Sequence, residues 1–287
     1  MGFTAHKTMR KRVYSSSGPQ HGHVLEWIQE ILGLLCNVAF VIGSVCFFSA
    51  SETVFAVGCW LFIGGSAVSS ILTGHQLYEQ LHVMNHHTPL LDKERNEVLE
   101  TLMFVISSFV FTVGCILFLP SDAMELFEES TGLGATLSII GSFLLVAAAH
   151  FNALSFSADK TDSQKHGVHP RQQGLTKALK QIGLGCTLAG AVLFTCGSFM
   201  YRPDFDGICI EDGPDKVDSP DKVCAKVADY GTLLYLIGSI LFLVQSMMSL
   251  SCLYIKQTAS DGADAGKGEA QKLVQGQSSG PGKAWRP

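Results

Sequence analysis

Six long apolar stretches constrain what this chain can fold into. They run over residues 27–48, 54–72, 102–119, 133–149, 182–200 and 232–253. A helix needs about 20 residues to cross the roughly 30 Å of hydrocarbon in a bilayer. Five stretches contain no Asp, Glu, Lys or Arg, and the first contains only Glu30, near its start. The sequence therefore predicts an all-α, polytopic membrane protein with six transmembrane helices and no carboxylate buried at mid-depth.

Residue pattern and composition argue against two alternatives, a soluble helical protein and a nucleic-acid-binding protein. A helix on the surface of a soluble protein carries a polar stripe at the 3.6-residue period, whereas these stretches are apolar on every side. Only 16% of the residues are charged, against about 25% in a typical soluble domain. The net charge of −5 and the lack of a basic patch interleaved with aromatic residues indicate no nucleic-acid partner.

The positions of the basic residues predict the orientation. Lys and Arg favour the cytoplasmic side of a membrane. With the N-terminus inside and six crossings, the outside loops hold only Arg202, Lys216, Lys222 and Lys226 of the 20 basic residues. We therefore expect a multi-pass protein with cytoplasmic N- and C-termini, in either the plasma membrane or an endomembrane. Its parts are a cytoplasmic segment, 1–23, a membrane domain, 24–256, and a disordered cytoplasmic tail, 257–287.

The apolar stretches share two motifs. In the second, fourth and sixth stretches, a glycine is followed by leucine three residues later, and by a Gly-Ser or equivalent pair starting seven residues later. These residues are Gly58, Gly65 and Ser66, then Gly134, Gly141 and Ser142, then Gly231, Gly238 and Ser239. In the odd-numbered stretches, a Phe lies three residues before Gly43, Gly114 and Gly197, and these glycines are followed by Ser44, Cys115 and Ser198. The recurrence predicts three repeated helical hairpins, at about 24–78, 98–152 and 178–256.

The shared glycines predict close helix packing. Lipid is as apolar as leucine, so membrane helices associate where small residues let their backbones approach. A spacing of seven residues places the two glycines of each motif on nearly one face, and the adjacent serine can hydrogen-bond across the contact. The same faces could instead line a pore or form a hinge, and that alternative stays open.

Two elements resemble a known family. They read Leu-Phe-Ile-Gly-Gly-Ser at 61–66 and Leu-Tyr-Leu-Ile-Gly-Ser at 234–239. They resemble the YrhK-like membrane domain, a short two-helix unit, over about 25–77 and parts of the later pairs. The resemblance implies the fold and a membrane location. It implies no activity, because the family has none established.

Few residues outside the helices suggest chemistry. His75, His82, His86 and His87 gather in the first predicted cytoplasmic loop, where they could bind a metal, sense pH or lie on a solvated amphipathic helix. Seven of the nine cysteines lie in or beside the apolar stretches and are expected to pack as small apolar residues. Cys209 and Cys224 lie in the third outside loop, where an oxidising exterior predicts a disulfide.

The sequence indicates no catalytic set and no cofactor. It has no Gly-x-Ser-x-Gly elbow, no HExxH and no Walker loop. Two functions remain. The first is a non-enzymatic structural, scaffold or sensory membrane protein that contacts protein partners through its cytoplasmic loops and tail. The second is a channel or facilitator for a small solute, which a continuous polar cavity touching Ser66, Ser142 and Ser239 would favour.

Overall fold

Six α-helices make up the described structure. The computed structural model describes residues 19–49, 51–84, 92–119, 130–162, 170–201 and 220–277. The helices are α2 (Pro19–Cys46), α3 (Glu52–Met84), α4 (Asp92–Leu117), α5 (Ser130–Asp162), α6 (Pro170–Met200) and α7 (Pro220–Gln277). Each contains a window long and apolar enough to cross a membrane, so the all-α prediction and the count of six candidate spans are confirmed.

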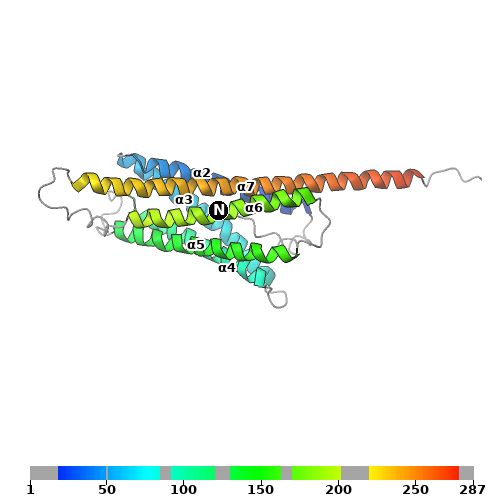
Figure 1. The fold of residues 1–287 in the computed structure, drawn as a ribbon, viewed down its shortest axis with the longest axis horizontal. Helices are drawn as coiled ribbons and strands as arrows, with labels where there is room; N and C mark the ends of the chain where they lie inside the picture. The colour runs from blue at the N-terminus through cyan, green and yellow to red at the C-terminus, as the bar shows by residue number, and fades with distance from the viewer. Residues whose placement is uncertain are drawn as a thin grey trace, which may run out of the picture.

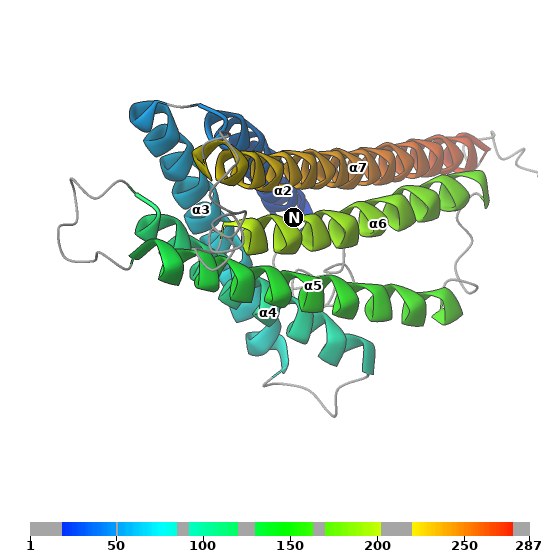
Figure 2. The same ribbon diagram turned by 60° about the vertical axis from the view of Figure 1, so that its left-hand side comes forward.

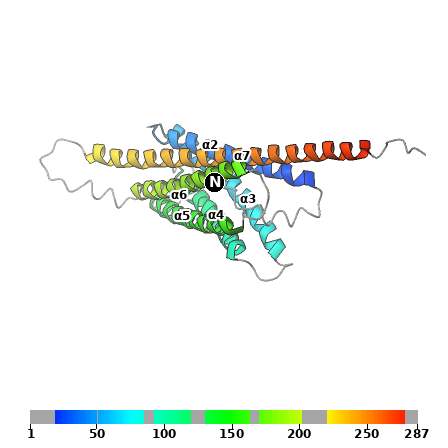
Figure 3. The ribbon, with the colours of Figure 1, turned by 45° about the vertical axis from the view of Figure 1, so that its right-hand side comes forward.

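The helices form a closed ring. Each helix packs against its neighbours in the chain, and α2 also packs against α7 (Figures 1 and 2). The views in Figures 1 and 3 show α7 as the longest helix, extending past the ends of the others. Helices α2, α4 and α6 run in the same direction around the ring. The end of the ring where these three helices begin is called the base, and the end where they stop is called the tip.

The surface and interior have the opposite polarity from a soluble protein. Large apolar side chains face outward, among them Ile71, Phe109 and Trp60, which are 71%, 65% and 60% exposed. The interior contains many polar side chains, including fully buried Ser44 and Ser198. Water would penalise this apolar surface, whereas lipid accommodates it. The arrangement fits a multi-pass membrane protein.

The helices extend beyond the apolar stretches, chiefly at the base. The third apolar stretch begins at residue 102, but α4 begins ten residues earlier, at Asp92. The polar residues of these extensions pack between helices, so they continue the helix although they are not apolar. At the other end of the chain, α7 continues to Gln277, so disorder from residue 257 onward is not confirmed. Residues 278–287 lie outside the described structure.

A polar contact joins the first and last helices. The Asn37 amide nitrogen donates to the carbonyl oxygen of Phe242 at 3.2 Å and to Ser246 Oγ at 2.5 Å. Nearer the base, Trp27 Nε1 donates to Gln257 Oε1 at 2.7 Å. Asn37 is buried, so its contact with α7 forms away from solvent. This interhelical role is the one that the sequence suggests for a polar residue within an apolar span.

Replacing Asn37 with leucine should weaken the contact between α2 and α7. We expect Asn37→Leu to lower the free energy of unfolding by about 1 kcal/mol, the scale of an interhelical hydrogen bond in a membrane protein. The measurement is unfolding of the purified protein in detergent. Ser251→Ala is the control, because the Ser251 hydroxyl is exposed and bonds to Met247 of its own helix. Equal stabilities of the two variants would contradict the role of Asn37.

Candidate functional site

Within each helix pair, a phenylalanine of the first helix lies on a glycine of the second. A Cβ added at Gly65 would lie 2.8 Å from Phe40 Cε1. The corresponding distances are 3.0 Å from Gly141 to Phe111 Cδ2 and 2.6 Å from Gly238 to Phe194 Cδ2. Contacts below 3.0 Å essentially never occur for a real Cβ, so Gly65 and Gly238 leave the space that the rings occupy.

The remaining glycines of the motifs lie opposite one another nearer the tip. A Cβ at Gly43 would lie 3.1 Å from the carbonyl oxygen of Gly58. The equivalent distances are 3.2 Å from Gly114 to Gly134 and 3.0 Å from Gly197 to Gly231. The backbones of each pair therefore approach closely here.

The motif serines join one pair to the next. Ser44 Oγ on α2 lies 3.1 Å from Ser239 Oγ on α7, and Ser142 Oγ on α5 lies 3.3 Å from Ser198 Oγ on α6. All four are fully buried. Ser66 is buried as well. The hydroxyls of Ser44, Ser142 and Ser198 also bond to carbonyl oxygens of their own helices, as Ser44 does to that of Phe40.

Aromatic rings fill the centre of the ring of helices. Phe194 lies near Phe62, Phe111, Tyr235 and Phe242, with ring centroids 6.3, 6.1, 4.9 and 5.4 Å away. These five side chains come from α3, α4, α6 and α7, and each is at least nine-tenths buried. Aromatic pairs at such distances add packing energy beyond the area that they bury. This aromatic cluster separates the tip from the base.

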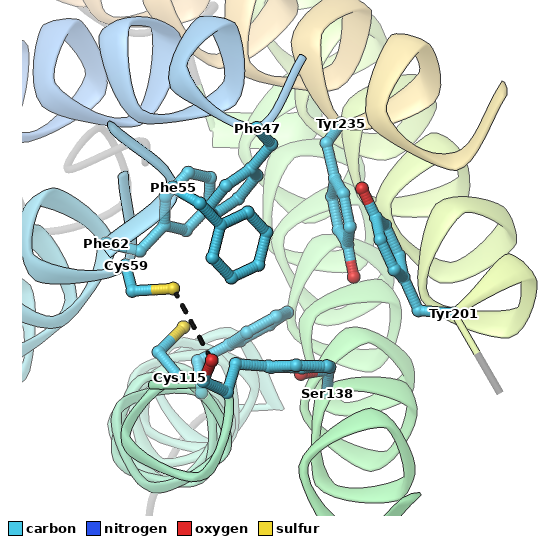
Figure 4. A pocket seen from close by; sticks show the side chains of 10 residues that line it. Phe47, Phe55, Cys59, Phe62, Cys115, Ser138, Tyr201 and Tyr235 are labelled. Carbon is cyan, nitrogen blue, oxygen red and sulfur yellow. Dashed lines mark hydrogen bonds between the residues drawn. The ribbon is translucent and has the colours of Figure 1, made fainter. Parts of the chain in front are cut away.

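A cavity of about 40 Å³ lies on the tip side of the aromatic cluster (Figure 4). Every helix or its adjoining turn contributes to its wall. The lining residues are Phe47, Phe55, Cys59, Phe62, Phe111, Cys115, Phe118, Ser138, Tyr201 and Tyr235. Ser66, Ser142 and Ser239 are not among them, so this cavity is not the continuous polar path that a channel through the motif serines requires.

Buried polar side chains lie at the base, and the sequence analysis missed them. Glu97 and Glu100 on α4 are 1% and 3% exposed, and Asn152 Nδ2 on α5 donates to Glu100 Oε1 at 2.5 Å. Gln76 and Gln80 on the neighbouring α3 are also buried. Both carboxylates precede the apolar stretch that begins at residue 102 and lie near the base end of α4, so the expectation that no carboxylate is buried at mid-depth stays a prediction. They were missed because the apolar stretch was taken as the limit of the helix.

Counting along the helices from the motif residues would have found some of these buried polar residues at the base. The residues 11 positions before the phenylalanines of α2, α4 and α6 are Gln29, Glu100 and Gly183, and all three are buried. The residues 11 positions after the second glycine of α3, α5 and α7 are Gln76, Asn152 and Ser249. Glu100 and Asn152 occupy matching places in these two series, and they bond to each other.

The predicted histidine and disulfide sites are only partly described. His75 and His82 lie on α3, where His75 Nδ1 is 3.8 Å from Glu79 Oε1 and the His82 ring stacks on Tyr78. His86 and His87 lie outside the described residues. Within the described part of the chain, no three His, Cys, Asp or Glu side chains gather as metal ligands.

The predicted disulfide stays a prediction. Cys209 lies outside the described residues, and Cys224 lies on α7 at a position where only the helix is described. The seven other cysteines are free thiols, from buried Cys36, Cys59, Cys115 and Cys252 to exposed Cys196.

The comparisons with known proteins identify a family for the first helix pair. Residues 23–81 match the family described as YrhK-like protein, which confirms the resemblance seen in the motifs. This segment covers most of α2 and α3. No curated protein and no solved structure matches the chain significantly.

Adjacent glycines on α3 allow a matched test of the ring-on-glycine contact. Gly65→Ala should lower the free energy of unfolding by about 1–3 kcal/mol, because its Cβ would overlap the Phe40 ring. Gly64→Ala should change it by less than about 1 kcal/mol, because no atom lies within 4 Å of a Cβ there. Thermal unfolding in detergent measures both. A neutral Gly65→Ala variant would contradict the close approach.

Proposed function

We propose that this chain is a non-enzymatic structural, scaffold or sensory membrane protein, built from three copies of one helical hairpin. The recurring contacts support the three copies. In each pair, phenylalanine lies on the second motif glycine, and the two remaining glycines face each other. Because each copy buries one face against the next, the ring needs all three for a continuous interior.

The observation that carries this proposal is the filled interior. The motif serines bond to each other between pairs, and the aromatic cluster occupies the space that a permeation path would need. A channel needs a continuous route lined by polar groups or ordered water. A ring whose motif serines bond to each other and whose centre is occupied by aromatic side chains is suited to holding loops and a tail in place. This arrangement favours the scaffold or sensory role.

We propose that the loops and the end of α7 are the contact points for partners. The positive-inside pattern supports cytoplasmic placement of both chain ends and of the base. Figure 1 shows α7 extending beyond the other helices on that side of the ring. This projecting segment lies in the protein's predicted cytoplasmic tail and is available to a protein partner there.

The facilitator for a small solute is the alternative function. Two features favour it: the cavity at the tip and the polar residues at the base, where Gln76 Nε2, Gln80 Oε1 and Glu100 Oε2 have no hydrogen-bond partner among the described residues. The aromatic cluster lies between these two regions. A facilitator would therefore need that cluster to open.

Solute flux separates the two functions. We expect liposomes containing the purified protein to take up glycerol, urea and monovalent cations no faster than protein-free liposomes, because the aromatic cluster fills the interior. Phe194→Ala thins this cluster, and Phe143→Ala removes an exposed ring as its control. Flux above background in the wild type that rises in Phe194→Ala alone would establish the facilitator instead.

Thiol labelling tests the orientation and the disulfide together. In sealed right-side-out vesicles, a membrane-impermeant maleimide should label Cys209 and Cys224 only after reduction. The reason is that the outside loop is accessible and its thiols are joined. The double variant Cys209→Ser, Cys224→Ser should lose this labelling. Labelling that requires permeabilised vesicles would contradict the proposed orientation. Labelling without a reductant would contradict the disulfide.

A further inference from the structure

The cavity at the tip coincides with a difference between the helix pairs. The residue four positions after the first motif glycine is Phe62 in α3, Tyr235 in α7 and Ser138 in α5. Phe62 and Tyr235 place their rings in the aromatic cluster, while Ser138 has only a hydroxymethyl group. All three line the cavity. The ring that the second pair lacks is therefore missing from the wall of this cavity.

In each pair, the residue at this position lies against a glycine of the preceding helix. In the first pair, a Cβ at Gly43 would lie 2.7 Å from Phe62 Cδ2, and in the third pair, one at Gly197 would lie 3.6 Å from Tyr235 Cδ1. In the second pair, the corresponding glycine is Gly114, and its nearest neighbour is Ser138 Oγ at 3.0 Å. In all three pairs the residue at this position therefore lies against the glycine of the preceding helix, and in the second pair that residue is a serine and not an aromatic.

The cavity wall suits an apolar occupant. Most of its lining is aromatic ring surface, together with the thiols of Cys59 and Cys115. The two tyrosine hydroxyls are engaged, since that of Tyr235 lies 2.7 Å from Ser198 Oγ and that of Tyr201 bonds to Thr232. Ordered water needs two to four polar partners, and an ion needs more. The wall offers a hydroxyl at Ser138 and two thiols, which are weak hydrogen-bonding groups.

We propose that this cavity binds a small uncharged molecule of hydrocarbon character, whose ring or short alkyl group takes the place of the side chain missing at Ser138. Its occupant contacts all three helix pairs at once. Through Tyr235 and Ser198 it also adjoins the serine contacts that join α5 to α6. Binding therefore stabilises the closed ring. The site gives the sensory form of the proposed function a ligand class, but binding does not depend on that role.

Fluorobenzene is a suitable probe of the site. We expect it to bind the wild-type protein in detergent saturably, with a shifted and broadened ¹⁹F resonance. At ten times its dissociation constant, it should raise the Tm by about 3–6 °C. Ser138→Phe should weaken binding at least about tenfold, because the new ring occupies the cavity as Phe62 and Tyr235 occupy their own positions.

Three further variants make the result decisive. Ser138→Ala keeps the cavity and should bind like the wild type. Thr136→Phe adds the same ring on the exposed face of α5 and also should not affect binding, which controls for fluorobenzene in the micelle. Cys115→Met fills the cavity from α4 and decides the matter if Ser138→Phe does not fold. No saturable binding by the wild type, or undiminished binding by both filled variants, would overturn the proposal. Neither result depends on the flux measurement.

Discussion

An aromatic ring lying on a glycine of the partner helix is the contact on which the rest of this structure depends. Each helix is long and apolar enough to cross a membrane, and in lipid the burial of apolar side chains gives little reason for two helices to associate. Because Gly65 and Gly238 have no Cβ, a phenylalanine of the partner helix can approach them to a distance that no other residue would allow. The dispersion energy gained there comes from many close atom pairs. Hydrogen bonds add to this contact within the pairs, as between Glu100 and Asn152 and between Ser198 and Tyr235.

Polar groups also join one pair to the next. Ser44 with Ser239 joins α2 to α7, and Ser142 with Ser198 joins α5 to α6. The aligned motifs place Ser66 and Cys115 at the corresponding positions of the α3–α4 interface. A thiol is a weaker donor than a hydroxyl, so this interface gains less from hydrogen bonding than the other two. Cys115 also lines the tip cavity, to which every helix or its adjoining turn contributes.

The sequence predicts those features that depend on local pattern. Six apolar stretches indicated six helices, and the glycine spacing indicated which faces carry small residues. The contact of α2 with α7 could not be predicted in this way, because it depends on how the pairs are placed around the ring. The polar base was missed for another reason. Helix limits taken from apolar residues stop at the first polar side chain, although Gln80 and Glu97 are buried by neighbouring helices.

The second pair departs from the other two at both ends of its interior. At the tip, Ser138 replaces an aromatic residue, and at the base, Glu100 replaces Gln29 of the first pair and Gly183 of the third. Packing alone explains neither change, since a missing ring leaves a cavity and a buried carboxylate is costly to desolvate. Asn152 offsets part of that cost through its hydrogen bond to Glu100. If one hairpin was copied three times, the positions where a copy abandons the better-packed residue are where function has outweighed stability, and Glu100 on α4 and Ser138 on α5 are two such positions.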